Sequence, residues 1–305
     1  QRLVNSNANS GFIAPRARST SDEQAAPIAP TVTVPAFADL HMHSHCSDGV
    51  LSPRVLIQNA AARGLRVVSL TDHDTVAGVA EARKMAAACG IQFVVGAELS
   101  VTVAGKEVHL LGYGFDPEDA GMQEHLRRFM AARAERAQRM VERLQQEGIA
   151  LTMDDVRAEA EDAHALGRPH VAAALVGSGT VDSLQAAFDR FLSPGQPAYV
   201  AKPETPVADV LTRLHRAGGV GVLAHPGQWT PTERLHRLLD AGLDGIEVAH
   251  PSHPPYLRTY YRQFAVRNDL LQTGGSDYHG PRHDDHFGSV GLSQRQWERL
   301  QEAVS

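Results

Sequence analysis

Cysteine is scarce in this 305-residue chain, which contains only Cys46 and Cys89. Two thiols in a chain of this size are typical of a reduced cytosolic protein, and they exclude a disulfide framework. No apolar run approaches the roughly 20 residues that a membrane-spanning helix needs, which argues against a transmembrane protein. From these absences we expect a soluble, cytoplasmic protein with no membrane partner.

Positive charge is not in excess either. Lysine and arginine number 29 against 35 aspartates and glutamates, which gives a net charge of −6. No global basic surface therefore indicates binding to long nucleic acid. A small anionic substrate would have to be held by local cations, and no feature of the sequence indicates a stable protein partner.

The order of apolar runs predicts the fold class. Residues 1–35 are rich in serine, asparagine, alanine and proline and lack a basic-then-apolar secretory pattern, so we expect a flexible N-terminal extension there. From residue 36 strand and helix patterns alternate, which is typical of an α/β protein with a mostly parallel sheet and crossover helices. Either a barrel or an open sheet could result.

The expected elements divide the rest of the chain into two parts. We expect strands over 38–41, 66–71, 92–98, 107–113, 220–224, 245–248 and 270–274, with a turn at Gly105. We expect helices over 52–64, with Ser52 as N-cap, and over 76–89, 233–241 and 255–267. Between 116 and 200 the pattern is helical alone. It predicts a helical insertion over 116–200 in a barrel formed by 36–115 and 201–305.

Imidazoles and carboxylates gather where the predicted strands end. In a βα barrel that end is the catalytic face. His41 and His43 are two residues apart, so both point to one side of an extended segment and can bind one metal ion. The candidate ligands are His41, His43, Asp48, His73, Glu98, His109, His225, Asp277 and His279.

This mixture of ligand types indicates a catalytic metal centre. Imidazole and carboxylate without thiolate suit manganese, iron or zinc and disfavour a structural zinc site of the thiolate type. At about three protein ligands per ion, nine ligands predict two or three ions that share a bridging carboxylate. Such a site activates water at neutral pH and holds a phosphoryl group during in-line displacement.

Six segments carry a resemblance to a known family. DLHMHSHCSDG, LTDHDT, GAELS, VHLLGY, LAHPG and GGSDYH occur here in the order and spacing of the PHP (polymerase and histidinol phosphatase) phosphoesterases, and the likeness spans about Ala38 to Gly291. The chain most resembles a bacterial subgroup that dephosphorylates 3′,5′-nucleoside bisphosphates, some members of which also trim RNA from its 5′ end. The resemblance implies a distorted seven-stranded βα barrel of the PHP type with three divalent ions, manganese first and iron or zinc as alternatives.

The resemblance also implies how the ligands are shared. His41, His43, Glu98 and Asp277 would hold the first ion, and Glu98 would bridge to a second ion held by His109 and His225. Asp48, His73 and His279 would hold the third. In the helical insertion, Arg168, His170 and Lys202 resemble anion-binding residues of the subgroup. Arg168 can bind a phosphate bidentately, and such remote binding would favour bisphosphates over monophosphates.

Several neighbouring residues have plainer interpretations. Asp72 and Asp74 either cap the following helix or orient His73. Outside the ligand set, we expect His45, His250, His253, His283 and His286 to be rim or solvent residues. The arginine-rich stretch with Arg133, Arg136 and Arg139 alternates with acids, which predicts a solvated helix face. A role in guiding RNA is the lesser alternative for these arginines.

Together these features predict an enzyme that hydrolyses the 3′-phosphate of 3′,5′-nucleoside bisphosphates to nucleoside 5′-monophosphate and phosphate. A 5′-to-3′ exonuclease activity on short RNA ends is a further expectation. One alternative is a phosphatase for histidinol phosphate or another small phosphomonoester. Another is a non-catalytic binding module stapled by metals, although a decayed PHP domain should have lost several of the nine ligands, and all are present.

Overall fold

The computed structural model describes residues 36–160, 166–228, 230–281 and 286–304, so the expected N-terminal extension over 1–35 lies outside the described residues. Seven strands form one sheet in sequence order. They are β1 (Ala38–Asp39), β2 (Val67–Leu70), β3 (Gln92–Val103), β4 (Lys106–Tyr113), β5 (Val220–Leu223), β6 (Gly245–Ala249) and β7 (Leu271–Gly274). The expected strands are thus confirmed, with shifts at their ends.

One strand runs against the others. Neighbours β1, β2 and β3 are parallel, as are β5, β6 and β7, whereas β4 is antiparallel to both β3 and β5. The reversal occurs at Ala104 and Gly105, which both have positive φ, 51° and 68°. Because of this hairpin, β4 brings its amino end to the rim where the parallel strands bring their carboxyl ends.

The two ends of the sheet meet and nearly close a barrel. Leu40 N donates to Gly274 O at 3.2 Å, and Asp277 N donates to His41 O at 2.8 Å. Gly275 permits this approach, because a Cβ there would lie 2.3 Å from the Cβ of His41. The distorted seven-stranded barrel that the resemblance implied is therefore confirmed.

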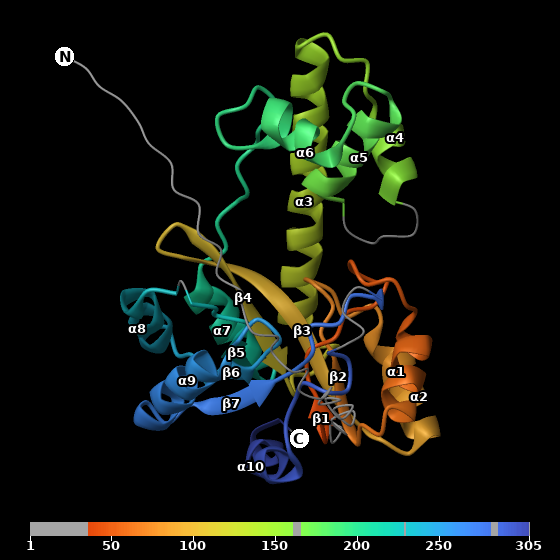
Figure 1. Cartoon of the computed structure of the whole chain (residues 1–305). Helices are drawn as coiled ribbons and strands as arrows, with labels where there is room; N and C mark the ends of the chain where they lie inside the picture. The colour runs from red at the N-terminus through yellow and green to blue at the C-terminus, as the bar shows by residue number, and fades with distance from the viewer. Residues whose placement is uncertain (1–35, 161–165, 229, 282–285, 305) are drawn as a thin grey trace, which may run out of the picture. The chain divides into compact units, whose positions relative to one another are not determined.

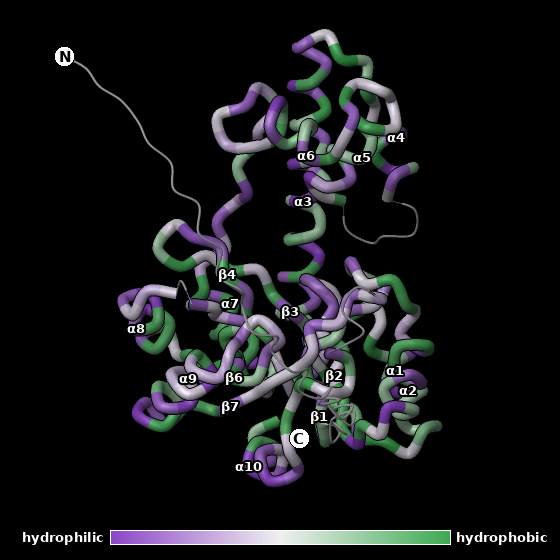
Figure 2. The backbone as a smooth tube through the Cα atoms, viewed as in Figure 1, coloured by the Kyte–Doolittle hydropathy of each residue, from purple (hydrophilic) through white to green (hydrophobic). Residues whose placement is uncertain are grey.

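Helices cover the outside of the sheet (Figure 1). They are α1 (Pro53–Ala62), α2 (Val79–Cys89), α7 (Val207–Arg216), α8 (Thr232–Asp240), α9 (Pro255–Arg267) and α10 (Gln294–Val304). Hydrophilic and hydrophobic residues alternate along α1 and α2 (Figure 2), as expected of helices with one buried face. Ser52 caps α1 as predicted, by accepting a hydrogen bond from Val55 N. The sequence analysis did not predict α7 or α10.

Between β4 and α7 every element in the described residues is helical. These are α3 (Ala120–Gln146), α4 (Met153–Ala160), α5 (Arg168–Gly177), α6 (Leu184–Ala187) and the π-helical turn η1 (Phe188–Leu192). At the start of α3, Met122 and Leu126 belong to the core of the barrel. Met140 and Leu144, near its end, belong to a separate core formed with α4 and α5. Every helix in the described part of the chain is too short or too polar to cross a lipid bilayer.

The buried hydroxyl of Tyr113 forms a hydrogen bond whose contribution to the stability of the barrel can be measured. Its Oη donates to Leu40 O at 2.7 Å, which connects β4 to the residue before His41. Replacing Tyr113 with Phe should lower the free energy of unfolding by about 1–3 kcal/mol, because a buried carbonyl loses its partner. Urea denaturation measures this loss.

Tyr256→Phe is the matched control. That tyrosine is 61% exposed and donates to Gln228 Oε1, so its replacement should change the free energy of unfolding by less than about 0.5 kcal/mol. Equal losses in the two variants would contradict the structural role given to Tyr113.

Candidate metal centre

All nine candidate ligands come together at one rim of the barrel. They arrive from different elements, because the fold gathers the segments that follow β1, β2, β5 and β7 beside residues within β3 and β4. The antiparallel direction of β4 is what brings His109, near its amino end, to this rim.

Glu98 lies at the centre of the cluster and is fully buried. Its two carboxylate oxygens face five imidazoles: His41 Nε2 at 3.1 Å, His43 Nε2 at 3.2 Å, His73 Nδ1 at 3.4 Å, His109 Nδ1 at 2.8 Å and His225 Nε2 at 2.9 Å. Burial opposes ionisation of Glu98, but its imidazole neighbours hold the pKa of its carboxyl group well below the ordinary value. One buried negative charge thus connects β3 and β4 with the segments that follow β1, β2 and β5.

Two other carboxylates complete the cluster. Asp277 Oδ1 lies 3.2 Å from His41 Nε2, and Asp48 Oδ1 lies 3.2 Å from His279 Nε2. Three overlapping groups offer ligand atoms within 4.8 Å of one another: His41, His43, Glu98 and Asp277; His43, Asp48, His73 and His279; and His73, Glu98 and His109. The first group has the same members as the first ligand set implied by the resemblance.

The chemistry of the cluster fits a bound cation. Both ring nitrogens of His43 and Nδ1 of His109 are buried and lie 2.8–3.7 Å from carboxylate oxygens, yet they form no well-aligned hydrogen bond within the described residues. This is costly unless something else binds them. Although burial disfavours imidazolium, the neighbouring carboxylates raise the pKa of His43 to about 9 and that of His109 to about 10. The site therefore attracts positive charge, and its nitrogen and oxygen donors suit a divalent transition metal.

Glu247, which the sequence analysis did not single out, contacts two of the candidate ligands. It is fully buried in the middle of β6, with Oε1 3.0 Å from His41 Nδ1. Oε2 accepts a hydrogen bond from His225 N at 2.7 Å. These contacts orient His41 so that its Nε2 faces Glu98. The only signal in the sequence was an acid within the otherwise apolar run GIEVA.

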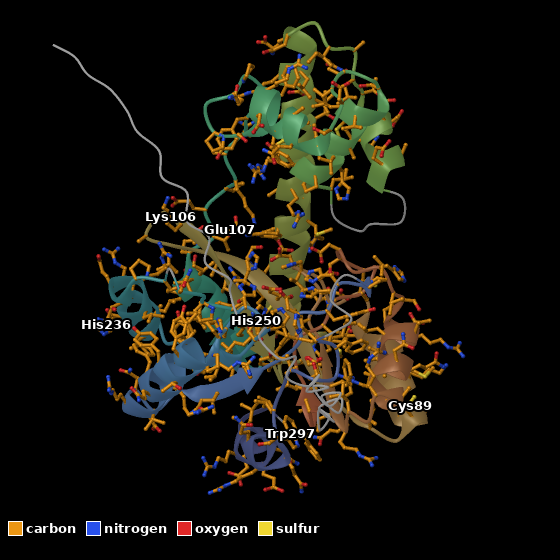
Figure 3. The ribbon with its side chains drawn as sticks, in the orientation of Figure 1. Cys89, Lys106, Glu107, His236, His250 and Trp297 are labelled. Carbon is orange, nitrogen blue, oxygen red and sulfur yellow. The ribbon has the colours of Figure 1, made fainter. Side chains whose placement is uncertain are left out.

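Two histidines expected at the rim or in solvent are in fact buried, so that prediction is wrong for them. His250 is 6% exposed and His253 only 1%. Nε2 of His250 lies 3.3 Å from Asp277 Oδ2, and its Nδ1 lies 2.8 Å from Ser252 Oγ. Figure 3 labels His250 in the central part of the barrel. His45 and His286 are exposed as expected, and His283 lies outside the described residues.

Asp72 and Asp74 hold the surrounding loops. Asp72 accepts hydrogen bonds from the backbone and hydroxyl of Ser44, each at 2.7 Å. Asp74 accepts from the backbone of Ser100 at 2.8 Å and from its hydroxyl at 2.9 Å. Neither caps α2, so that alternative is wrong. Both instead fix the segments that carry the ligands.

The backbone is strained at three residues of this region. Asp74, His225 and Asp277 have φ values of 53°, 24° and 51°, which are unfavourable for residues other than glycine. Hydrogen bonds from His225 N to Glu247 and from Asp277 N to His41 hold two of these conformations. Such strain persists only where many contacts determine the local structure, as they do here.

A cavity of about 320 Å³ separates the metal cluster from the helical segment. Its barrel side includes Asp48, His73 and His109, and its helical side includes Arg133, Arg136, Arg168, Tyr199 and Lys202. Two of the three predicted anion-binding residues, Arg168 and Lys202, therefore line it. His170 is not among the lining residues, and its Nδ1 accepts a hydrogen bond from Gly167 N at the start of α5.

Arg133 and Arg136 were expected on a solvated helix face, and this is wrong for both. Both are half-buried. Arg133 Nε donates to Leu166 O at 3.2 Å, and Arg136 Nε donates to Val200 O at 2.8 Å. Burial and the adjacent charge of Arg168 lower the pKa of Arg136, which shows how closely the cations gather. Arg139 is exposed, as expected.

Comparisons with known proteins agree with this geometry. The PHP domain matches residues 39–146. A 3′,5′-nucleoside bisphosphate phosphatase of Chromobacterium violaceum is 39% identical over 81% of this chain and 88% of that protein. A 5′-3′ exoribonuclease of Haemophilus influenzae is 35% identical over 80% of this chain and 90% of its own. A structure described as a metal-dependent phosphoesterase from Bifidobacterium adolescentis aligns with a TM-score of 0.76 and 34% identity, covering 89% of this chain and 99% of that one.

Replacing Glu98 with Gln tests the metal centre. The substitution keeps the shape of the side chain and removes the charge that faces five imidazoles, so the protein should lose at least half of the divalent metal that it retains after dialysis. Elemental analysis per mole of folded chain gives the result. Glu81→Gln, an exposed change in the first turn of α2, should leave the metal content unchanged. Wild-type metal content in Glu98→Gln would refute the central role of this carboxylate.

Proposed function

The chain belongs to the PHP-domain family of metal-dependent phosphoesterases, and on that premise we propose that it hydrolyses the 3′-phosphate of 3′,5′-nucleoside bisphosphates. The products would be a nucleoside 5′-monophosphate and phosphate. One observation carries the proposal: the cavity has a metal-binding cluster on one wall and three half-buried guanidinium groups on another. A substrate with two phosphates fits such a cavity, because each phosphate meets its own binding site.

We propose that the cluster holds three divalent ions, with manganese as the first choice. The ligands would be His41, His43, Asp48, His73, Glu98, His109, His225, Asp277 and His279. When bound, such ions supply an activated water and neutralise charge on the reacting phosphate. The protein's part is to hold these ligands rigidly, through Glu247 beneath His41 and the hydrogen bonds that fix Asp277.

The helical segment would bind the phosphate that does not react. Arg168 can bind it bidentately, and Arg133 and Arg136 are held beside Arg168 by bonds to backbone carbonyls. Their partial burial reduces screening by water and strengthens the attraction. The ring of Tyr199, which also lines the cavity, offers a surface on which a base can stack.

The other anion-binding candidates would have smaller parts. Lys202 Nζ is already paired with Glu107 Oε2 at 2.9 Å, which reduces the charge that it offers to a substrate. His170 uses Nδ1 as an acceptor from Gly167, which leaves Nε2 as its donor. Burial and the nearby charge of Arg133 lower the pKa of His170, so its ring would be neutral at physiological pH.

The alternatives account for less of the structure. A small monophosphate such as histidinol phosphate would leave Arg136 and Arg168 without a second phosphate to bind, although burying them has a cost. Arg133 already faces a carboxylate of the protein, with Nη1 3.8 Å from Asp74 Oδ2. A non-catalytic module would not need the second wall of the cavity at all. The similarity to a bisphosphate phosphatase and to an exoribonuclease also favours a nucleotide phosphate ester as the substrate.

Replacing Arg168 with Gln tests whether the arginine wall binds the second phosphate while the metal cluster acts on the first. The kcat/KM for adenosine 3′,5′-bisphosphate should fall about 10- to 100-fold, because a charged hydrogen bond contributes about 1.5–3 kcal/mol. For adenosine 3′-monophosphate, which lacks the second phosphate, kcat/KM should change less than about threefold by the same reasoning. Phosphate release in the presence of Mn²⁺ measures both.

Arg139→Gln serves as the control, since Arg139 is exposed on the same helix as Arg133 and Arg136 and does not line the cavity. Its kinetics should match those of the wild type. If Arg168→Gln slowed both substrates equally, the bisphosphate interpretation of this wall would be rejected. If the wild type released no phosphate from the bisphosphate with Mn²⁺, the proposed function would fail as a whole.

A further inference from the structure

A second cavity, of about 230 Å³, adjoins the first. It lies between α3, the segment 202–206 and α7, and three residues line both cavities: Arg133, Arg136 and Lys202. The proposed bisphosphate substrate would use the first cavity, so the second has no part in the function proposed above.

The two cavities follow one another along a single face of α3. His125, Phe129 and Ala132 line the second, Arg136 lines both, and Met140 lines the first. These positions are separated by three or four residues, the spacing of one helix face. At 1.5 Å per residue the face from His125 to Met140 is about 22 Å long. A flexible chain that leaves the first cavity along this face would enter the second.

Positive charge dominates the second cavity. Its lining includes the cations Arg128, Arg133, Arg136, Lys202 and Arg213 and the acids Glu204 and Asp209. Arg128 is already paired with Glu124, but Arg213 is half-buried and has no hydrogen bond or ion pair from its side chain within the described residues. Nε2 of His125, on the same wall, is buried and has no hydrogen-bond partner in the described part of the chain. Both groups lack an acceptor.

A short series of contacts leads from the metal cluster to this cavity. His109 Nε2 lies 3.7 Å from Glu107 Oε1, and Glu107 Oε2 lies 2.9 Å from Lys202 Nζ. Lys202 Nζ in turn lies 5.1 Å from the ring centre of Phe129. Figure 3 labels Glu107 on the β3–β4 hairpin, at the end of the barrel that faces the helical segment. Lys202 therefore connects the metal cluster with the second cavity, which it also lines.

We propose that the second cavity binds the next phosphodiester of a single-stranded oligonucleotide whose terminal nucleotide occupies the first cavity. Arg213 would pair with that phosphate, His125 would donate a hydrogen bond to it, and the apolar surface of Pro203 and Pro206 would contact the sugar. The combination of a cationic groove with apolar surface is typical of sites for single-stranded nucleic acid. This inference rests on the proposed function and assigns the residues that would bind the second nucleotide of the short RNA ends expected from the sequence.

Arg213→Gln is the decisive variant. The probe is a 5′-phosphorylated tetraadenylate with phosphorothioate linkages and a 3′ fluorophore, and its Kd for the manganese-loaded protein is measured by fluorescence anisotropy. The substitution should weaken binding about tenfold, as expected for the loss of a charged hydrogen bond. It should also reduce the slope of log Kd against log salt concentration by about 0.7, the contribution of one phosphate contact to a single strand. The kcat/KM for adenosine 3′,5′-bisphosphate should stay within about twofold of the wild type, because that substrate does not reach Arg213.

Two further variants separate charge from folding. Arg213→Lys keeps the charge and should restore most of the affinity for the tetranucleotide. Arg216→Gln, an exposed change on the same helix that lines neither cavity, should bind it like the wild type. If Arg213→Gln bound the tetranucleotide as tightly as the wild type, or if the wild type did not bind it, the second cavity would not be a nucleotide subsite.

The same experiment distinguishes this inference from the proposed function. Hydrolysis of the bisphosphate together with tetranucleotide binding that is insensitive to Arg213 would overturn the inference alone. Tetranucleotide binding that depends on Arg213, without any hydrolysis of the bisphosphate, would overturn the proposed function and support the subsite.

Discussion

The buried carboxylate of Glu98 sets the main constraint on this structure. A negative charge removed from water must be compensated, and here five imidazoles from four separate segments supply the compensation. The compensation is incomplete, because some of those ring nitrogens lack partners of their own. Burying these groups therefore lowers the stability of the protein, and bound cations would restore it. Metal binding and ordering of the ligand segments at the rim are thus coupled.

The rest of the barrel serves to bring those segments together. Asp39 illustrates how: its Oδ1 accepts hydrogen bonds from His41 N, after β1, and from Ser276 N, after β7. The carboxylate thereby joins the two edges of the sheet next to the ligands His41 and Asp277. Reversal of β4 has a similar effect, since a parallel strand would have left His109 at the far end of the barrel. Closure of the sheet and assembly of the site are thus the same structural event.

The order of the strands and the nine candidate ligands could be predicted from the sequence, because strand geometry determines which side chains share a side. Residues at period two after a strand, such as His41 and His43, must share a side, and parallel strands must end at one rim. Glu247, His250 and Arg133 were missed or misplaced because a polar side chain in a sequence is expected in solvent unless a pattern says otherwise. Their burial depends on which distant segment covers them. Only the folded chain reveals that covering, as when α3 turns Arg133 towards the cavity.

Helix α3 accounts for how chemistry and selectivity can be combined in one protein. Its first turns pack in the core of the barrel and its last turns in the core of the helical segment, so its middle turns are fixed relative to the metal cluster. Arg133 and Arg136 lie in those middle turns. Cations on a mobile lid would lose part of their binding energy to ordering, whereas cations on a helix anchored at both ends are already in place. The same anchoring lets this helix present a continuous face to a longer substrate, so that recognition can extend away from the reacting centre without changing it.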